Sequence, residues 1–456
     1  MKHLLTLLLT ILIAAFPKTG NAQKFYQYRI YLADKNASAY SLTNAEQFLS
    51  TKSIERRKRR NIPIDSTDLP VCSSYTNELA KNGLRILATS RWLNSVLIET
   101  PDSTNIDVLL NKLPFVSSWK EAETRNNHEN KERIVSITDE YQQKNDYYGA
   151  ATQNMLSVRG LRKIHSAGFR GQGMNVAIID AGFKNADTLS LLKKTSIVAK
   201  RNFTHSGNDL FANDTHGLDV LTLMGANLPH ILVGTAPEAS YTLLKSEESE
   251  TENPYEEDNW IAALEFADSL GIDVVNSSLG YYEFSHAAWN YSTTELDGQH
   301  SPASRAASLA ASKGMLLCIS IGNLGNSEWK TMTVPADAEN ILTIGAVNKD
   351  GKHSAFSSLG PSADGRTKPD VCVLGENILV PNENGELTKG SGTSFASPIL
   401  CGAATCLWQK HPNAKAIEII EAIRQSASLY NKPNNEYGFG LPDFQKADAI
   451  LCNQSH

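Results

Sequence analysis

The sequence predicts an α/β protein: a doubly wound parallel sheet forms the larger part, and a small α/β domain precedes it. From about Tyr147 onward, short apolar runs alternate with segments of helical period. This pattern is typical of strands buried on both faces and helices that cover them. Residues 23–124 instead alternate strand-like and helix-like segments of mixed polarity. A length of 456 residues also favours more than one domain.

In the larger part we expect five strands and four helices, in alternation. The expected strands are "NVAIID" (175–180), "ASYTLLK" (239–245), "IDVVNSSLG" (272–280), "GMLLCISIGN" (314–323) and "ILTIGAV" (341–347). The expected helices are "GLDVLTLMGAN" (217–227), "NWIAALEFADSLG" (259–271), "SRAASLAASKG" (304–314) and "SFASPILCGAATCLWQKH" (394–411). In such a sheet, ligands and chemistry lie at the carboxyl ends of the strands.

The smaller domain, residues 23–124, is expected to contain two strands and three helices. The strands are "KFYQYRIYLAD" (24–34) and "NSVLIET" (94–100), and the helical patterns cover 44–60, 74–83 and 104–113. The run "RRKRR", Arg56 to Arg60, allows a dibasic processing site, but its helical period favours a solvated helix face. A charged stretch from Trp119 to Asp146 lacks periodicity and predicts an exposed linker, where proteolytic nicking concentrates.

The first 22 residues are predicted to be a signal peptide and not part of the fold. A basic start precedes an apolar run from Leu4 to Phe16, which closes with the small-residue pattern Gly20-Asn21-Ala22. The run is shorter than the roughly 20 residues that a membrane span needs. We therefore expect an exported protein, secreted or periplasmic, with no stable membrane anchor.

Charge and cysteine content argue against two further classes, a nucleic-acid-binding protein and a protein stabilised by a disulfide framework. A net charge of −6 argues against a nucleic-acid partner. Six cysteines are few for an exported chain of this size. Cys401 and Cys406 lie five residues apart on one predicted helix and point to different sides of it, which is poor geometry for a bridge. We expect most of the cysteines to be small buried apolar residues, with stability supplied by the core.

Four polar residues lie at the predicted edges of the sheet, and each has an ordinary structural alternative. Asp180 closes an apolar strand but could cap a helix. His216 opens a helix and could be a cap or surface residue. Asn323 stands between glycines in good turn chemistry. Ser394 precedes an apolar helix, where a serine is most often an N-cap.

Taken together, the four residues provide every group needed for nucleophilic acyl transfer. A hydroxyl nucleophile needs an imidazole to take its proton, and the imidazole needs a carboxylate to orient it. An asparagine amide and a helix N-terminal N–H can stabilise the oxyanion. The chain supplies Asp180, His216, Asn323 and Ser394 in that order, each at the edge of a strand–helix unit.

The motifs around these residues resemble those of the subtilisin family of serine peptidases. "VAIIDAGF", "DTHGLDV" and "GTSFASP" are similar to the family's aspartate, histidine and serine motifs. "SIGN" resembles its oxyanion-hole motif, and "VVNSSLG" its substrate-pairing strand. "VPADAENILTIGAV", "FSSLG" and "YGFGLPD" extend the resemblance, which covers about residues 157–450.

The resemblance implies a role for each matching residue. Ser394 would be the nucleophile, His216 the general base and Asp180 its orienter. The Asn323 side chain and the Ser394 N–H would bind the oxyanion. The residues implied to flank the substrate are Ser278, Leu279, Gly280, Ser320, Ile321 and Gly322. The implied substrate is a polypeptide, bound as an added strand.

The resemblance also implies how the chain is organised. Residues 23–124 would be a propeptide that acts as an intramolecular inhibitor and folding template, residues 125–150 a linker with the maturation site, and residues 151–456 the catalytic domain, a monomer. A permanent accessory domain is the alternative for 23–124. No cofactor is implied. Calcium is possible, but the sequence identifies no metal site, and the acidic stretch from Glu247 to Asp258 is at least as well explained as a solvated loop.

Three departures from the family pattern leave the catalytic groups in place. Ala181 stands where Thr or Ser is usual, Leu218 where Thr is usual, and "KPDVCVLG" replaces a common Ala-Pro-Gly pattern. Two alternatives stay open: acyl transfer to an amine, as in a ligase, which needs the same residues, and peptide binding without catalysis on the same scaffold. The complete set of four groups argues against the second.

Two other motif interpretations fail. "GFRGQG" precedes its strand and cannot be a dinucleotide loop. No Gly-x-Ser-x-Gly surrounds a plausible nucleophile, which argues against an α/β-hydrolase esterase.

Overall fold

The fold is described from a computed structural model. It describes residues 24–125, 146–205, 207, 209–248 and 252–454. The predicted signal peptide and most of the predicted linker lie outside these residues. None of the helices in the described ranges is both long enough and apolar enough to cross a bilayer.

The larger domain is built on a parallel sheet, as expected. Within the described residues the sheet has seven strands in the order β13-β12-β11-β10-β5-β9-β6, and every neighbouring pair is parallel. The strands are β5 (Asn175–Asp180), β6 (Ser196–Asn202), β9 (Ser240–Lys245), β10 (Val274–Ser277), β11 (Leu316–Ser320), β12 (Leu342–Val347) and β13 (Val371–Leu374). The five expected strands are confirmed. The two edge strands were not predicted: β6 is largely exposed and has no buried apolar run, and β13 is a short strand of four residues.

Helices cover both faces of this sheet. Val176 and Ile178 of β5 point into the core beneath α6 and α9, whereas Ala177 and Ile179 point into the core beneath α7 and α8. The helices of this domain are α4 (Thr152–Ser157), α5 (Leu161–Ser166), α6 (His216–Gly225), α7 (Tyr255–Leu270), α8 (Pro302–Ser312), α9 (Thr393–Lys410), α10 (Ala416–Ser426) and α11 (Phe444–Gln454). Two small hairpins complete it: β7 (Asn227–Leu228) with β8 (Leu232–Val233), and β14 (Ile378–Pro381) with β15 (Leu387–Gly390).

The N-terminal domain is an antiparallel sheet with helices, and it differs from the expectation at three places. Its sheet order is β2-β3-β1-β4. Its elements are β1 (Phe25–Leu32), α1 (Thr51–Arg59), α2 (Ser73–Lys81), β2 (Arg85–Ser90), β3 (Ser95–Thr100), α3 (Ile106–Asn111) and β4 (Val116–Arg125). The strands β2 and β4 were not expected. The expected helix over 44–60 is divided into a short 3-10 segment, Leu42–Gln47, and α1, which starts after the N-cap Ser50.

The β4 strand corrects the predicted start of the linker. Residues 119–125, expected to be exposed linker, pair with β1, so that Trp119 lies opposite Ile30 and Glu121 opposite Tyr28. The strand was missed because its own residues are largely polar. Pairing with an apolar neighbouring strand determined its conformation, and this pairing is not visible in the segment itself.

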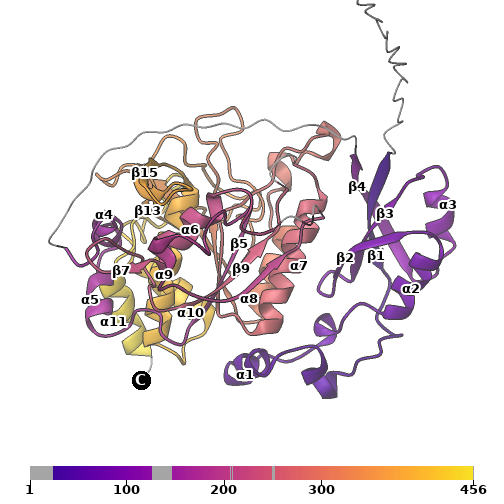
Figure 1. The fold of residues 1–456 in the computed structure, drawn as a ribbon, viewed down its shortest axis with the longest axis horizontal. Coiled ribbons are helices and arrows are strands. Elements are labelled where there is room, and N and C mark those ends of the chain that lie inside the picture. The colour runs from indigo at the N-terminus through magenta and orange to yellow at the C-terminus, as the bar shows by residue number, and fades with distance from the viewer. Residues whose placement is uncertain (1–23, 126–145, 206, 208, 249–251, 455–456) are drawn as a thin grey trace, which may run out of the picture.

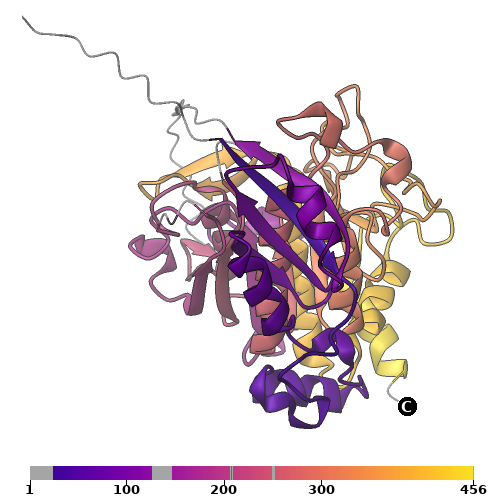
Figure 2. The ribbon, with the colours of Figure 1, turned by 90° about the vertical axis from the view of Figure 1, so that its right-hand side faces the viewer.

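Two helices of the larger domain form the surface on which the N-terminal domain lies. In Figure 1, α7 and α8 stand between the parallel sheet and the sheet of β1 to β4, and Figure 2 shows the N-terminal sheet across the face of the larger domain. Trp92, at the end of β2, is buried in the same core as Trp260 and Leu264 of α7. The interface is therefore partly apolar.

Ionic contacts to α7 complete this interface. The carboxylate of Asp268, fully buried, accepts hydrogen bonds from Arg56, from Arg57 Nη2 at 2.9 Å and from Arg91 Nη2 at 2.6 Å. One turn earlier, Glu265 accepts the hydroxyl of Ser90 at 2.6 Å. Three guanidinium groups around one carboxylate hold its pKa below the usual value, although burial acts in the opposite direction.

The predicted solvated face of "RRKRR" is therefore wrong. Arg56, Arg57 and Arg60 are buried, because the larger domain covers this side of α1; only Lys58 and Arg59 of the run are exposed. At the other end of α7, Arg29 of β1 pairs with Asp258 through two hydrogen bonds of 2.8 and 2.6 Å. The charge of a predicted helix face does not show whether that face contacts solvent or an acidic partner.

The described cysteines are all unbridged. Five are buried, and Cys452 is exposed. The expectation that most of them are small apolar core residues is confirmed.

We predict that Asp268→Ala lowers the free energy of unfolding of the intact chain by about 3–5 kcal/mol, because it removes the carboxylate partner of the buried Arg56 and of Arg91 and leaves Arg57 with Asp68 alone. Urea unfolding of the intact chain measures this. Asp187→Ala, at an exposed aspartate, is the control and should change the value by less than about 0.5 kcal/mol. Equal stabilities of the two variants would contradict the prediction.

Candidate active site

The four candidate residues occupy the carboxyl edge of the parallel sheet. Asp180 is the last residue of β5, and Asn323 follows β11 by three residues. His216 is the first residue of α6, and Ser394 is the second residue of α9. Both helices pack on the same face of the sheet. The fold therefore gathers the four residues at one edge.

The structure brings Asp180 and His216 into direct contact. His216 Nδ1 lies 2.7 Å from Asp180 Oδ1. The start of α6 is held against the end of β5 by a hydrogen bond of 2.9 Å from the Gly217 N–H to the Gly182 carbonyl. A Cβ on Gly217 would lie 2.4 Å from that carbonyl oxygen, so only glycine allows this approach. The His216 side chain remains 31% exposed and can be reached from solvent, whereas Asp180 is fully buried.

The electrostatics of this pair favour a charged imidazole. Burial lowers the pKa of His216, but the charge and hydrogen bond of Asp180 outweigh it, and the pKa rises to about 9. Asp180 Oδ2 is buried and has no hydrogen-bond partner among the described residues. Ala181, which has no hydroxyl group, donates only its backbone N–H, at 2.8 Å to Oδ1. Ala181 therefore supplies no side-chain donor for the second oxygen.

Ser394 is held by an exchange of hydrogen bonds with Ser278. Pro398 has no N–H to donate to the Ser394 carbonyl one turn earlier in α9. The Ser278 hydroxyl donates to that carbonyl instead, at 2.9 Å. In return, the Ser394 hydroxyl donates to the Ser278 carbonyl at 3.4 Å. Within the described residues no hydrogen bond joins Ser394 to His216. The helix itself continues through Pro398, so the proline costs α9 this single hydrogen bond.

Two donors near the start of α9 have no hydrogen-bond partner within the described residues, the Asn323 NH₂ group and the Ser394 N–H. The Asn323 side-chain oxygen accepts the N–H and the hydroxyl of Thr393 at 2.8 and 2.9 Å, which fixes the amide and leaves its NH₂ group available. The Ser394 N–H lies in the first turn of α9 and has no carbonyl partner within the helix. A methyl group built on Gly392 would be 3.5 Å from Asn323 Nδ2 and 3.6 Å from the Ser394 nitrogen. Both donors therefore flank the same space.

The two segments expected to flank a substrate differ in what they offer. In the described hydrogen bonds, the backbone groups of Leu279 and Gly280 are unused, so this segment can pair with an added strand. In the other segment, Ile321 O accepts Thr333 N–H, Gly322 O accepts Ser358 N–H, and Gly322 N–H donates to the Thr393 hydroxyl. Residues 320–322 can therefore form a wall but have few backbone groups left to donate or accept.

Gly390 lies four residues before Ser394, and its missing side chain leaves room for another group. A Cβ at Gly390 would lie 2.5 Å from the ring of Phe395. The protein's own aromatic side chain fills that space, so this glycine serves internal packing.

The sequence analysis did not identify Asp219 as part of this site. Asp219 follows His216 by three positions and lies on the same side of α6. Burial raises the pKa of its carboxyl group to about 8, and its Oδ1 has no hydrogen-bond partner among the described residues. The spacing of three residues on a predicted helix was the signal that could have revealed it.

In the part of the chain that the structure describes, two groups of side chains have the spacing of metal ligands, but neither fits a metal well. Glu247, Glu252 and Glu256 bring carboxylate oxygens within 4.8 Å of one another. Both oxygens of Glu256 already accept backbone N–H groups, and burial raises the pKa of Glu247 to about 8. In the second group, Asp448 is paired with Lys410 and His411. We assign no metal to either.

The predicted solvated loop from Glu247 to Asp258 is partly wrong. Glu247 and Glu256 are buried, and the stretch from Tyr255 onward belongs to α7. Residues 249–251 lie outside the described part of the chain.

Comparison with known proteins agrees with this fold. A model of the subtilase family matches residues 171–440, and a model of the peptidase S8 propeptide domain of Bacteroidota matches residues 27–138. Subtilisin NAT of Bacillus subtilis subsp. natto is 28% identical over 287 residues, 62% of this chain and 68% of that protein. Subtilisin DY of Bacillus licheniformis is 26% identical over 289 residues, 62% of this chain and 94% of that protein.

A solved structure shares the fold over almost the whole chain. The epidermin leader peptide processing serine protease from Staphylococcus aureus has a TM-score of 0.63 at 17% identity, covering 93% of this chain and 98% of that one. The fold and the matches define a serine peptidase with an N-terminal propeptide. The chain belongs to the subtilase family, and it is a serine endopeptidase, a hydrolase.

We predict that kcat/KM of the mature enzyme rises with pH, with a midpoint well above 6.5, the ordinary histidine value, and approaching 9. The sign follows because a base must be unprotonated, and Asp180 holds the proton on His216 to higher pH. The pH profile of kcat/KM, which reports free-enzyme groups, measures it. A midpoint at or below 6.5 would show that Asp180 does not control His216.

We predict that Asn323→Ala lowers kcat by about 10²–10³-fold with little change in KM, because an oxyanion donor acts mainly in the transition state. This magnitude is the one established for an oxyanion-hole asparagine of a subtilisin and is adopted from there. Steady-state kinetics on a peptide substrate measures it. Asn326→Ala, at an exposed asparagine three residues further on, is the control. A loss confined to KM would assign Asn323 to substrate binding only.

Proposed function

We propose that this subtilase is an exported endopeptidase that hydrolyses peptide bonds through a triad of Asp180, His216 and Ser394 and an acyl-enzyme intermediate. The observation that carries the proposal is the contact of 2.7 Å between His216 and Asp180, at the same sheet edge as a serine flanked by two unpaired donors. The proposal covers the residues, the export and the maturation of the chain.

In the proposed reaction, the Ser394 hydroxyl turns from the Ser278 carbonyl to His216 Nε2. His216 takes the hydroxyl proton as Ser394 Oγ bonds to the scissile carbonyl carbon, and Asp180 stabilises the resulting imidazolium. The Asn323 amide and the Ser394 N–H bind the oxyanion. His216 then protonates the leaving amine as the C–N bond breaks. In the second half, water attacks the acyl carbon while His216 takes its proton. The ester C–O bond breaks as His216 returns that proton to Ser394 Oγ, which releases the acid.

We further propose that the substrate binds as an extended strand beside residues 278–280. The unused backbone groups of Leu279 and Gly280 support this, because a peptide added there gains main-chain hydrogen bonds. Ser278, Ser320, Ile321 and Gly322 would then line the site of the residue before the scissile bond. Both ends of a substrate could extend from such an open edge, as endopeptidase cleavage requires.

The maturation that we propose starts with removal of residues 1–22 after export to the periplasm or the medium. Residues 23–124 would then act as an intramolecular inhibitor until a cut within 125–150 frees the catalytic domain, residues 151–456, as a monomer. The contacts of Arg29 and the arginines of α1 with α7 support a propeptide that stays bound after that cut.

A fluorophosphonate probe tests the nucleophile. We expect covalent labelling of the mature wild-type enzyme, none of Ser394→Ala, and accumulation of uncut precursor in the variant. Ser397→Ala is the matched control, one turn further along α9, and should still label. If the mature wild type resists the probe while correctly folded, the chain binds peptides without acyl-enzyme chemistry. Labelling that persists in Ser394→Ala would identify another nucleophile.

A further inference from the structure

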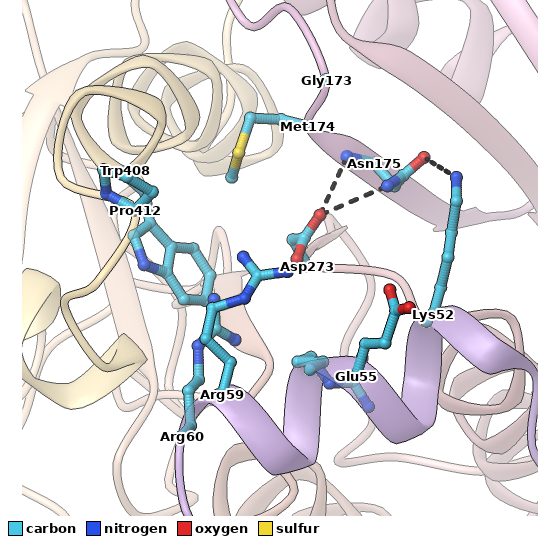
Figure 3. A pocket seen from close by; sticks show the side chains of 12 residues that line it. Lys52, Glu55, Arg59, Arg60, Gly173, Met174, Asn175, Asp273, Trp408 and Pro412 are labelled. Atoms are coloured by element: carbon cyan, nitrogen blue, oxygen red, sulfur yellow. Dashed lines mark hydrogen bonds between the residues drawn. The ribbon is translucent and has the colours of Figure 1, made fainter.

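A cavity lies between the propeptide and the catalytic domain, at the end of the sheet opposite to the active site. It is close to Asn175, the first residue of β5, whereas Asp180 is the last. Its volume is about 220 Å³, which exceeds the roughly 30 Å³ of one water several-fold. Helix α1 forms one wall, and Trp408 of α9 contributes to the other (Figure 3).

Positive side chains outnumber negative ones around this cavity. Its cations are Lys52, Arg56, Arg59 and Arg60, and its acids are Glu55 and Asp273. Asp273 accepts the N–H of Asn175 at 3.2 Å, and Arg56 is neutralised by Asp268. For Arg59 and Arg60 there is no carboxylate partner in the described ranges. Figure 3 shows both side chains rising from α1 into the space between Trp408 and Asp273.

Arg60 is the least compensated of these cations. Only 6% of the residue is exposed, and its guanidinium lies 4.1 Å from the Trp408 ring. Nη1 donates to the Gly314 carbonyl at 2.7 Å, but Nε is buried without a partner in the described structure. Burial lowers the pKa of Arg60 to about 10, although the negative charge of Asp273 acts in the opposite direction. A buried guanidinium with no carboxylate in direct contact is costly, and an anion beside it would reduce that cost.

We propose that this cavity binds a small inorganic oxyanion of the phosphate or sulfate class, held by Arg59 and Arg60 with help from Lys52. The guanidinium fork matches the geometry of such an anion. The cations come from the propeptide and the opposite wall from the catalytic domain. The site is therefore complete only while the two are docked.

This arrangement makes the anion a regulator of propeptide release. A ligand that binds only the docked form stabilises it by mass action; at ten times its dissociation constant, propeptide release is disfavoured about elevenfold. The binding itself does not depend on the proposed catalytic chemistry, since it can be measured on uncut chain.

The test is calorimetric titration of the intact Ser394→Ala chain with inorganic phosphate, against chloride at matched ionic strength. We expect saturable binding of one phosphate per chain. Arg59→Ala should weaken it at least fivefold. Lys58→Ala is the matched control, because Lys58 is the neighbouring exposed cation of α1 and does not line the cavity; it should bind as before. Arg60→Gln, with folding checked by circular dichroism, should weaken binding further.

Several results would overturn the proposal. Absence of saturable binding removes the site, and equal losses in Arg59→Ala and Lys58→Ala reduce it to diffuse surface charge. Glycerol 3-phosphate tests the source of the anion: weaker binding than phosphate supports a free ion, and equal or tighter binding overturns that part. Failure of fluorophosphonate labelling leaves these titrations unaffected, so the two proposals fail separately.

Discussion

Helix α7 has to satisfy two neighbours at once, and both domains depend on it. Its apolar side, with Trp260 and Leu264, packs on the parallel sheet. Its opposite side carries the buried acids Asp258 and Asp268, which need counter-charges because buried carboxylates without partners are costly. The propeptide supplies those counter-charges as arginines. Docking of the propeptide thereby adds to the fixation of the helix that supports β5 and, at its end, Asp180.

This dependence gives the two states of the enzyme different surfaces. In the intact chain the acids of α7 are paired, and apolar contact around Trp92 closes the interface. If the propeptide leaves as proposed, the same acids and the arginines of α1 would face water. Release would then cost ionic pairing and recover hydration of both partners, and a ligand bound only to the docked form would shift this balance.

At the carboxyl edge of the sheet, hydrogen bonds from neighbouring side chains hold the candidate catalytic groups in place. Pro398 leaves the Ser394 carbonyl without its helical donor, and Ser278 fills the position from the neighbouring strand. This links the turn that carries the nucleophile to the segment proposed to hold the substrate. Thr393 likewise orients Asn323: its N–H and hydroxyl donate to the amide oxygen, so that the NH₂ group stays available. Neighbouring residues thus orient each reactive group.

The sequence by itself determined the α/β class, the central strands and the four candidate residues. These follow from local information: apolar runs buried on both faces are recognisable without neighbours, and the motifs around Asp180, His216 and Ser394 are contiguous. Asp219 was within reach of the same reasoning, since its spacing from His216 is local.

Tertiary structure decided what depends on a distant partner. The polar strand β4 forms because β1 pairs with it, and Arg56 and Arg57 are buried because Asp268, more than 200 positions away in the chain, attracts them. The pairing of Ser278 with Ser394 and the fit of Gly390 to Phe395 are likewise contacts between surfaces that only the fold brings together. The sequence shows that a residue is charged or has no side chain. Which partner it contacts depends on how distant segments pack against one another.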